Sequence, residues 1–528
     1  MNMTLEQIAR LLEEEGLLAQ DAPSLAAAGT TAITGVDCDS RFAAPNHLFV
    51  CKGAAFKPAY LTGALAAGCV AYLCDESHGA ELAATAPDAP ALVVRDDGLR
   101  RAMAVTSAEA WGHPDRQLDV IGITGTKGKS TVAYMMRAIL DAGEPKSRCA
   151  IMGSIDTFDG VEDAESVNTT PEPPDLWRHI DNAARSGLGH MVMEVSSQAL
   201  KYDRVVGLTL DVSCFLNIGR DHISPREHPS FEDYFESKLR IFDQASSAVV
   251  NLESEQAGVV LEHARRTGRV MTFSSASDAA EKGADVWCEE VTSHGGIQAF
   301  TAHTPSWEGE VTLSMAGLFN VDNALAAIAM CELLDVPQPQ VRQGLAHVRV
   351  PGRMELLPTA DPKVTGIVDY AHNKLSYQKF FHSVAHEFAD RKIIAVLGAP
   401  GGKAYERRQE LPQEAAKWAD HLIFTEEDPA HDSVAEICRQ MAEATPAGCA
   451  HESIVERPLA IRRAVQLGFA APNGAVICLL AKGDETVQHV GDRFVPMETD
   501  GSVFEREVAA ALLAGADGNA PDDARSSR

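Results

Sequence analysis

Several features that would place this chain in a common class of protein are missing from its 528 residues. It contains no apolar run of about 18 residues, the length that a membrane-spanning helix needs. Residues 1–18 have the pattern of an acidic amphipathic helix and lack the basic start and apolar centre of a secretory signal. We therefore expect a cytoplasmic protein that neither spans nor binds a membrane.

Positive charge and paired cysteines are also scarce. The 46 Lys and Arg residues are outnumbered by 75 Asp and Glu, and the formal net charge of −29 disfavours nucleic acid as a partner. A polyanionic substrate would need local basic pockets. The 11 cysteines include no C-x-x-C pair, so we expect small buried hydrophobes in a reducing compartment.

The complete P-loop pattern is missing as well, because Ile123 stands where that pattern requires a glycine, five residues before Gly128. A shorter glycine turn nevertheless lies between an apolar run and a stretch with helical spacing. In such a turn, backbone N–H groups face a phosphate, Lys129 adds charge and Ser130 can ligate Mg²⁺. The turn predicts binding of ATP or a similar nucleotide through Gly125, Thr126, Lys127, Gly128, Lys129, Ser130 and Thr131. The alternative is an ordinary strand-to-helix turn with a chance Lys-Ser pair.

The whole chain divides into three α/β segments and a tail. Residues 1–117 alternate short strands and helices. Residues 118–350 and 351–514 each alternate strand and helix as a doubly wound sheet does, with polar or glycine-rich loops after the strands. Residues 515–528 are polar and rich in small side chains, so we expect a disordered tail.

Polar side chains end two apolar strands near the glycine turn. Glu194 closes the first strand, and the second leads into the stretch Asn217 through His222. Because acidic groups at strand ends beside a phosphate turn are natural Mg²⁺ ligands, we expect a metal site here. Lys238 follows on a predicted helix, where the usual interpretation is a solvated surface lysine.

Several further stretches share the pattern of one family. In chain order they are Asp39-Ser40-Arg41, Asn168 through Pro171, Glu194 through Ser197, Asn217 through His222, Tyr234 through Lys238, Gly317 through Asn323, Gly352 through Glu355, Asp369 through His372, and Lys482 through Glu485. With these stretches and the short loop G-T-x-G-K-[ST], the chain resembles the Mur ligases, ATP-dependent amide-forming enzymes of peptidoglycan synthesis, and is most similar to the MurE step. The resemblance implies three domains: an N-terminal UDP-sugar-binding domain, a central P-loop-type ligase domain that binds ATP, and a C-terminal Rossmann-like domain that binds an amino acid.

Such an enzyme joins an amino acid to the D-Glu of UDP-N-acetylmuramoyl-L-Ala-D-Glu. ATP phosphorylates the γ-carboxylate, and the amine then attacks the acyl phosphate. Phosphoryl transfer between two anions needs metal and cationic groups that offset charge, and positioning does most of the rest. The resemblance thus implies that the protein binds ATP and two Mg²⁺ ions. We expect a monomer that acts on small molecules.

The resemblance assigns roles to single residues. Lys129 matches the contact to the β- and γ-phosphates, and Ser130 with Glu194 matches the ligands of one Mg²⁺. His222 is similar to the ligand of a second metal. Lys238 matches the family lysine that is carbamylated and so helps to bind that metal. The implied catalytic residues are therefore Lys129, Glu194, His222 and Lys238.

Other residues are implied for the nucleotide and the acceptor. Asn320 resembles an adenine contact, with a helix cap as the alternative, while Arg353 and Asp369 resemble contacts to phosphate and ribose. Hydroxyl groups among the acceptor contacts can equally be helix caps. The implied acceptor contacts are Ser40 on the uracil side and, around the peptidyl portion, Thr169, Thr170, Ser196 and Arg204.

The third segment bears on the choice of amino acid. Family members that take meso-diaminopimelate carry Asp-Asn-Pro-Arg, whose arginine can pair with the distal carboxylate. This chain has Glu427-Asp428-Pro429-Ala430 instead. Ala430 offers no partner to a carboxylate, and the acidic residues here would attract an ammonium group, with Asp428 and Glu485 as implied contacts. We therefore favour L-lysine or ornithine over diaminopimelate.

Some positions depart from the family pattern. Gln198 and Asp484 stand where histidine is usual, and Asn373-Lys374-Leu375 replaces Thr-Pro-Asp. The loop 403–408 aligns only loosely, so an arginine there can serve a carboxylate, which keeps diaminopimelate open. The departures bear on substrate handling, because the phosphate and metal positions are retained.

Two other classes of interpretation remain, another amide ligase and a scaffold. Among the related amide ligases, a folylpolyglutamate synthetase is disfavoured by the motifs at 168–171, 194–197 and 369–372. An amidating relative with a zinc insert is disfavoured because no paired cysteines are present. The other interpretation is a nucleotide-binding scaffold without catalysis, which the retained metal and phosphate residues argue against.

Overall fold

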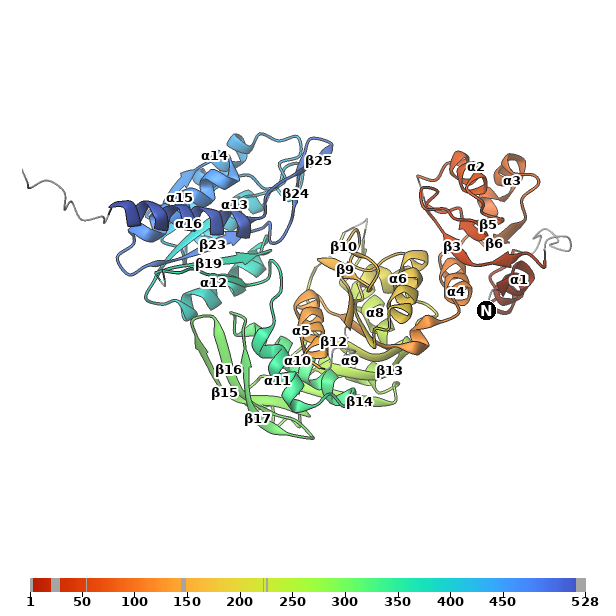
Figure 1. The fold of residues 1–528 in the computed structure, drawn as a ribbon, viewed down its shortest axis with the longest axis horizontal. Coiled ribbons are helices and arrows are strands. Elements are labelled where there is room, and N and C mark those ends of the chain that lie inside the picture. The colour runs from red at the N-terminus through yellow and green to blue at the C-terminus, as the bar shows by residue number, and fades with distance from the viewer. Residues whose placement is uncertain are drawn as a thin grey trace, which may run out of the picture. The chain divides into compact units, whose positions relative to one another are not determined.

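The computed structural model describes residues 3–19, 29–53, 55–143, 149–221, 223–224, 227–361 and 363–518. The chain divides into two compact units, each built from separate stretches. The first comprises Met1–Cys288, Ala302–Gly309 and Asn323–Gly344, and the second comprises Glu289–Thr301, Glu310–Asp322 and Leu345–Arg528. Figure 1 shows their helices and strands. Within the described residues, no helix combines the length and the apolar character that a membrane crossing requires.

A four-stranded parallel sheet opens the first unit. Its order is β3 (Gly35–Asp37), β4 (His47–Val50), β5 (Ala71–Asp75) and β6 (Ala91–Val94). The short strands β1 (Met3–Thr4) and β2 (Ala32–Ile33) pair with each other, and the helices are α1 (Leu5–Glu14), α2 (Pro58–Ala66), α3 (Glu76–Thr85) and α4 (Leu99–Trp111). Helix α1 begins where Thr4 forms a capping box with Gln7, and it buries Leu5, Ile8 and Leu12 on one face.

An 11-stranded sheet follows, with parallel strands in the order β8-β11-β7-β12-β13-β14 at its centre. The strands are β7 (Asp119–Thr124), β8 (Cys149–Met152), β9 (Asp156–Phe158), β10 (Asp163–Glu165), β11 (His190–Glu194), β12 (Leu210–Phe215), β13 (Ala245–Asn251), β14 (Arg269–Ser274), β15 (Val286–His294), β16 (Ile297–His303) and β17 (Glu308–Leu313). The α-helices are α5 (Lys129–Asp141), α6 (Pro173–Arg185), α7 (Ser197–Lys201), α8 (Phe231–Leu239), α9 (Ala257–Ala264), α10 (Phe319–Leu333) and α11 (Gln338–His347). Because β7 lies between β11 and β12, the loops after these three parallel strands meet at one edge of the sheet.

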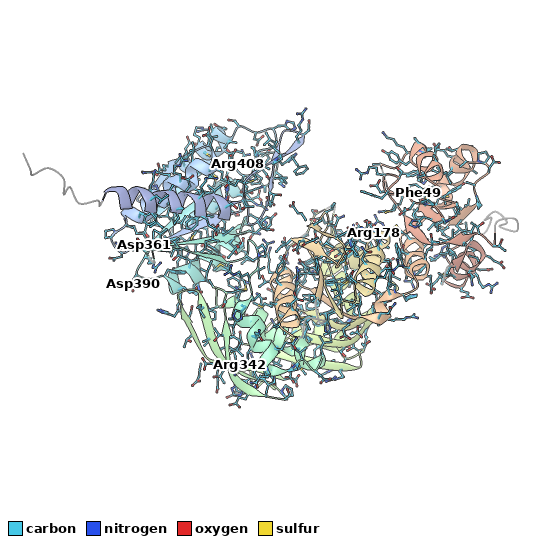
Figure 2. All side chains as sticks on the ribbon, in the orientation of Figure 1. Phe49, Arg178, Arg342, Asp361, Asp390 and Arg408 are labelled. Atoms are coloured by element: carbon cyan, nitrogen blue, oxygen red, sulfur yellow. The ribbon has the colours of Figure 1, made fainter. Side chains whose placement is uncertain are left out.

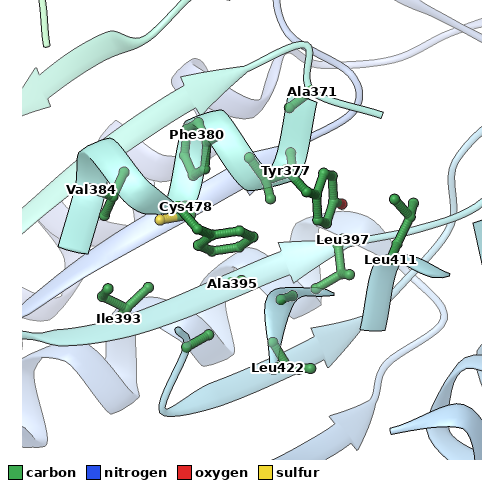
Figure 3. Packing of buried hydrophobic residues seen from close by; sticks show 14 of the residues in the cluster. Ala371, Tyr377, Phe380, Val384, Ile393, Ala395, Leu397, Leu411, Leu422 and Cys478 are labelled. Carbon is green, nitrogen blue, oxygen red and sulfur yellow. The ribbon is translucent and has the colours of Figure 1, made fainter. Parts of the chain in front are cut away.

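The second unit contains a six-stranded sheet in the order β18-β19-β23-β20-β21-β22, antiparallel only between its first two strands. The strands are β18 (Glu355–Pro358), β19 (Val364–Asp369), β20 (Lys392–Leu397), β21 (His421–Phe424), β22 (Ala450–Ser453) and β23 (Ala475–Leu480), with a hairpin of β24 (Val487–Val490) and β25 (Arg493–Pro496). The helices are α12 (Lys374–Glu387), α13 (Arg407–Ala415), α14 (Val434–Ala444), α15 (Arg457–Ala470) and α16 (Asp500–Gly518). Figure 3 shows Tyr377 and Phe380 of α12 in a core with Leu397 and Leu422 of the strands.

The predicted α/β class with parallel, doubly wound sheets is confirmed. Each of the three predicted segments has a sheet of its own, whereas the exact boundaries between them stay predictions. Helix α16 continues to Gly518, so the predicted start of the tail at residue 515 falls inside a helix. Residues 519–528 lie outside the described part of the chain.

A buried carboxylate joins the turn between β9 and β10 to α6. Asp159 accepts hydrogen bonds from His179 Nδ1 at 2.7 Å, from Asn182 Nδ2 at 2.8 Å and from two backbone N–H groups of the turn. Arg178, labelled in Figure 2, pairs from the same helix with Glu162. Burial alone would raise the pKa of Asp159, but these hydrogen bonds, His179 foremost, lower it to about 2.

Replacing Asp159 with Asn should therefore lower the free energy of unfolding by about 2 kcal/mol at pH 7. The folded pKa lies below the ordinary value of 3.8, so this stabilisation is complete above about pH 4 and is lost as the pH falls towards 2. Urea unfolding at pH 7 and pH 5 should give the same deficit. Asp163→Asn, on the exposed strand β10, is the control and should change stability by less than about 0.5 kcal/mol. A variant as stable as the parent would contradict this account.

Candidate active site

The predicted phosphate loop lies between β7 and α5. Gly128 has a φ of 91°, a left-handed conformation that glycine adopts readily, and α5 begins directly after it. A side chain at 128 would also place its Cβ 2.6 Å from Asn323 Oδ1 on α10. In the described chain, no side chain caps the N-terminus of α5, which suits a helix start that binds an anion.

Asn217, the first residue of its predicted motif, holds this loop in shape. Its side-chain oxygen accepts the N–H of Lys127 at 2.9 Å, and its amide donates to the Lys127 carbonyl at 3.0 Å. Thr126 Oγ1 accepts the N–H of Gly219 at 3.0 Å and lies 3.1 Å from Tyr234 Oη. The loop after β12 and helix α8 thus fix the phosphate loop from both sides.

Two lysines converge on one carbonyl oxygen at the start of the loop. Lys129 Nζ donates to the Gly125 carbonyl at 3.1 Å, and Lys238 Nζ donates to the same oxygen at 2.9 Å. Lys238 is 1% exposed, and its ammonium lies 4.8 Å from the centre of the Tyr234 ring. Burial lowers the pKa of Lys238 well below its ordinary value, Lys129 lowers it further, and Asp221 opposes the shift. The surface-lysine interpretation of Lys238 is therefore wrong.

Three oxygen-bearing side chains meet at the ends of β8 and β11. Glu194 is buried, and its Oε1 accepts the N–H of Ser154 at 2.8 Å and the Ser154 hydroxyl at 3.2 Å. Ser154 Oγ lies 2.9 Å from Ser130 Oγ. A Cβ on Gly153 would lie 2.5 Å from Glu194 Oε1, so any larger residue at 153 would require the Glu194 carboxylate to move. A carboxylate with two hydroxyl groups is the hard oxygen set that Mg²⁺ prefers, and these residues therefore fit the ion.

A pocket next to the loop gathers most of the predicted acceptor residues. It brings the two lysines together with hydroxyl, amide and guanidinium groups from several loops. The lining residues are Lys129, Asn168, Thr169, Thr170, Ser196, Ser197, Gln198, Arg204, Glu227 and Lys238. Gln198, which departs from the family pattern, thus faces the same space as the predicted contacts.

Structural hydrogen bonds already engage several of these groups. Thr170 Oγ1 donates to the Glu194 carbonyl at 2.9 Å and accepts the N–H of Ser196 at 3.0 Å. Ser196 Oγ caps α7 by accepting the N–H of Ala199 at 3.1 Å. Arg204 donates to the Thr170 carbonyl at 3.0 Å. The capping interpretation of the Ser196 hydroxyl is thus observed, although the residue also lines the pocket.

The second unit holds the predicted nucleotide contacts Arg353 and Asp369. Asp369 Oδ2 accepts the N–H of Met354 at 2.8 Å, and its Oδ1 accepts the N–H of Ala371 at 2.7 Å. The Arg353 guanidinium lies 4.6 Å from the centre of the Tyr370 ring. Asn320, in the first turn of α10, donates to the Ala316 carbonyl at 2.6 Å.

The acidic residues at and near the turn Glu427–Ala430 differ in their partners. Asp428 lies 2.8 Å from Lys482 Nζ, and Lys482 also pairs with Glu485. Glu427 is 8% exposed, and its Oε2 makes no hydrogen bond within the described residues. Burial raises the pKa of Glu427 to about 7, against the opposing charges of Arg457 and Arg407. The predicted contact Asp428 is thus paired with a lysine, whereas one carboxylate oxygen of Glu427 has no hydrogen-bond partner within the described residues.

The loop 403–408 contains two arginines, Arg407 and Arg408, which differ in their surroundings. Arg408 is buried and is held by Asp432, by the Pro400 carbonyl and by Gln440. Arg407 is only partly buried, and its charge acts on Glu427. The structure thus favours Arg407 over Arg408 as a group that can meet a carboxylate.

The two remaining predicted residues are His222 and Ser40. His222 lies outside the described residues. Ser40 follows β3 in the small sheet, where its neighbour Arg41 pairs with Asp39. Among the predicted departures, Asn373 has a structural function, because it forms a capping box with Ser376 at the start of α12.

Sequence reasoning missed Ser154, the backbone and hydroxyl donor to Glu194, and the contact of Asn323 with the phosphate loop. Ser154 follows Gly153 directly after the apolar strand β8, so a glycine-serine pair at a strand end was the available signal. Asn323 is the last residue of the motif Gly317 through Asn323. Its contact joins α10 to the loop after β7, which local sequence does not reveal.

Comparisons with known proteins agree with this geometry. Residues 123–331 match the family model described as the Mur ligase middle domain, and residues 352–483 match the one described as the Mur ligase, glutamate ligase domain. A UDP-N-acetylmuramyl-tripeptide synthetase of Bifidobacterium longum is 36% identical over 525 residues, covering 96% of this chain and 99% of that protein. The UDP-N-acetylmuramoyl-L-alanyl-D-glutamate–L-lysine ligase of Enterococcus faecalis is 33% identical over 477 residues, covering 90% of this chain and 92% of that protein.

A solved structure shares the fold. It is a UDP-N-acetylmuramoyl-L-alanyl-D-glutamate–2,6-diaminopimelate ligase, 22% identical, which covers 97% of this chain and 100% of its own with a TM-score of 0.67. At this identity the likeness shows the fold alone.

Gly153→Ala should displace Glu194 from the oxygen cluster, because the added Cβ would lie 2.5 Å from Glu194 Oε1. The affinity for ATP in the presence of Mg²⁺ should fall by about 10- to 100-fold, as when a metal ligand loses its support. Calorimetric titration with and without Mg²⁺ measures the change, which should be small without the metal. Gly189→Ala, where a Cβ meets no atom within 4 Å, is the matched control. Equal Mg²⁺-dependent affinities in the two variants would contradict the assignment.

Proposed function

The chain belongs to the Mur ligases, ATP-dependent enzymes that form amide bonds in peptidoglycan synthesis, and from this premise we propose that it adds L-lysine to UDP-N-acetylmuramoyl-L-alanyl-D-glutamate through an acyl phosphate. The observation that carries the proposal is the pocket in which Lys129 and Lys238 share walls with Thr170, Ser196 and Arg204. Cationic groups at one part of this pocket suit phosphates, and polar groups at the other suit a peptide carrying carboxylates.

ATP with Mg²⁺ supplies the phosphoryl group that activates the acceptor carboxylate. Ser130 and Glu194 would hold one ion, supported by Ser154, while His222 and a modified Lys238 would hold a second. Lys129 offsets the charge of the phosphates beside the N-terminus of α5. Because Lys129 and Lys238 both donate to the Gly125 carbonyl, their Nζ atoms are held in place before a nucleotide arrives. Asn320, Arg353 and Asp369 would contact adenine, phosphate and ribose.

The surroundings of Lys238 support its proposed carbamylation. Its hydrogen bonds go to neutral oxygen atoms of Gly125 and Thr124. Burial and the charge of Lys129 lower the pKa of Lys238, which favours the neutral amine more than at an exposed lysine. A neutral amine adds to CO₂ and releases one proton, giving a carbamate. The new negative charge would be attracted by Lys129 and could serve as an oxygen ligand for metal.

With ¹³C-labelled bicarbonate, the protein should show a carbamate carbonyl signal by NMR. This signal should be absent from Lys238→Gln, whose ligase activity should also fall by about 100-fold or more. Lys282→Gln removes an exposed lysine that pairs with Glu253 and Asp278, and it should keep both the signal and the activity. A parent protein without a carbamate signal would rule out the modification.

The choice of lysine rests on the unpaired acid of the second unit. Glu427 offers a buried oxygen without a hydrogen-bond partner in the described chain, and the hydroxyl of the buried Tyr377 is also unpartnered there. Burial raises the pKa of Tyr377, and the charge of Glu427 raises it further. A distal ammonium can bind between a carboxylate and a phenol oxygen. Arg407 would meet the carboxylate of the same amino acid.

Phosphate release from ATP in the presence of the UDP-linked dipeptide should require L-lysine. L-Ornithine should support slower release, and meso-diaminopimelate should support little, because its distal carboxylate would meet Glu427. Turnover with diaminopimelate alone would keep the ligase and overturn the lysine proposal. If none of the three amino acids supports phosphate release, the proposed acceptor is wrong or the protein is a nucleotide-binding scaffold without catalysis.

Glu427→Gln should raise the KM for lysine by about tenfold or more and change kcat less, because only the ammonium contact is lost. In the parent, the KM for lysine should fall as the pH rises through about 7, since the pKa of Glu427 is raised to about 7 and only its charged form attracts the ammonium. This pH dependence should disappear in Glu427→Gln. Glu456→Gln, at an exposed position near the start of α15, is the control and should behave as the parent does.

A further inference from the structure

A row of three hydrogen-bonded side chains ends in the pocket at Ser197, and neither its histidine nor its aspartate is among the residues that line the pocket. Ser197 Oγ lies 2.9 Å from His228 Nε2, and His228 Nδ1 lies 2.6 Å from Asp233 Oδ2. Asp233 also accepts from Lys201 Nζ at 2.7 Å. The imidazole is fully buried, and the serine, which lines the pocket, is 5% exposed.

The order of donors and acceptors in this row follows from its carboxylate end. An ionised Asp233 can only accept, so His228 donates from Nδ1 and its Nε2 is then an acceptor. Ser197 must donate its hydroxyl proton to Nε2, which turns the lone pairs of its oxygen away from the ring. Burial lowers the pKa of His228 and Asp233 raises it, while Lys201 and Lys238 lower it. A neutral imidazole at rest is consistent with this order.

The position of the serine oxygen gives the row a place in the reaction. Ser197 is the first residue of α7 and lines the same pocket as Lys129 and Lys238. That pocket is where the acyl phosphate would form. A hydroxyl oxygen that accepts hydrogen bonds in this space would face an N–H donor, and the attacking amine is the donor that the reaction brings in.

Resting on the proposed ligation, we propose that Ser197, His228 and Asp233 form a proton relay for amide formation. The amine enters as its free base, and its lone pair forms the C–N bond at the acyl carbon. One proton passes from that nitrogen to Ser197 Oγ while the serine proton passes to His228 Nε2, and Asp233 stabilises the imidazolium. The C–O bond to phosphate then breaks and its electron pair leaves with the phosphate. The proton returns through Ser197 to the phosphate, so that the products are the amide and hydrogen phosphate.

A clamp is the simpler alternative for a buried histidine between two helices. Asp233 lies on α8, which also carries Lys238, while Ser197 lies on α7. A row that only joins these helices would stabilise both stages of the reaction equally, because both depend on the same pocket. A relay acts after the acyl phosphate has formed, so the two stages separate the interpretations.

The experiment measures the two stages in Ser197→Ala, Ser197→Thr and His228→Gln. Acyl phosphate made from ATP and the UDP-linked dipeptide without amino acid is trapped by reduction with borohydride, and the complete reaction is followed with L-lysine. In Ser197→Ala and His228→Gln, trapping should stay within about twofold of the parent, while kcat of the complete reaction falls by about 100-fold at an unchanged KM for lysine. Ser197→Thr keeps the hydroxyl and should recover most of the rate.

A matched control and a double variant complete the design. His190 also pairs through Nδ1 with an aspartate, Asp119, but at the amino ends of β11 and β7, so His190→Gln should leave both stages unchanged. In a relay, Ser197→Ala combined with His228→Gln should be no slower than the worse single variant, because the groups act as a unit.

Three results would overturn the relay. An equal fall in trapping and in the complete reaction would leave a clamp, and an unchanged rate in Ser197→Ala would remove the serine from the reaction. A parent that traps no acyl phosphate with this acceptor would overturn the proposed function itself and the relay with it. Normal trapping in the parent together with either of the first two results would overturn the relay alone.

Discussion

The convergence of the Lys129 and Lys238 side chains on the Gly125 carbonyl is the interaction on which the rest of the first unit depends. Lys129 Nζ and Lys238 Nζ each lie within 3.1 Å of this oxygen and donate to it. Two positive charges that share one acceptor repel each other. Burial and that repulsion lower the pKa of Lys238. Anions would relieve this repulsion: phosphate oxygens near Lys129 and, with the proposed modification, a carbamate on Lys238. The two lysines therefore make this site suitable for polyanionic substrates. The chain as a whole is strongly negative.

The surrounding structure keeps those two charges in place with neutral groups. Asn217 holds both backbone groups of Lys127, and Tyr234 covers the Lys238 ammonium with its ring while its hydroxyl meets Thr126. The buried carboxylate of Glu194 accepts hydrogen bonds from the backbone N–H and the hydroxyl group of Ser154. Hard oxygen ligands and cationic groups therefore meet at the carboxyl ends of neighbouring parallel strands, where the sheet supports both.

The second unit uses charge pairing in a different way. Its acids lie close together, but buried cations hold most of them: Lys482 pairs with Asp428, and Arg457 pairs with Asp500 at 2.5 Å. These pairs leave Glu427 as a buried carboxylate whose second oxygen has no partner in the described chain. An unpaired buried acid is costly for folding. Its retention in this turn is consistent with a ligand that supplies the missing positive charge.

The sequence by itself determined the local elements: the apolar strand, the glycine turn and the helix from Lys129, because spacing and glycine positions are read along the chain. Its ordered motifs also determined the family. Only the tertiary structure decided which polar groups meet, such as Ser154 with Glu194, or Ser197 with His228. It also decided which acid stays unpaired at Glu427–Ala430. These pairings join strands, helices and loops that lie far apart in sequence. Burial, which lowers the pKa of Lys238, exists only once the sheets have packed.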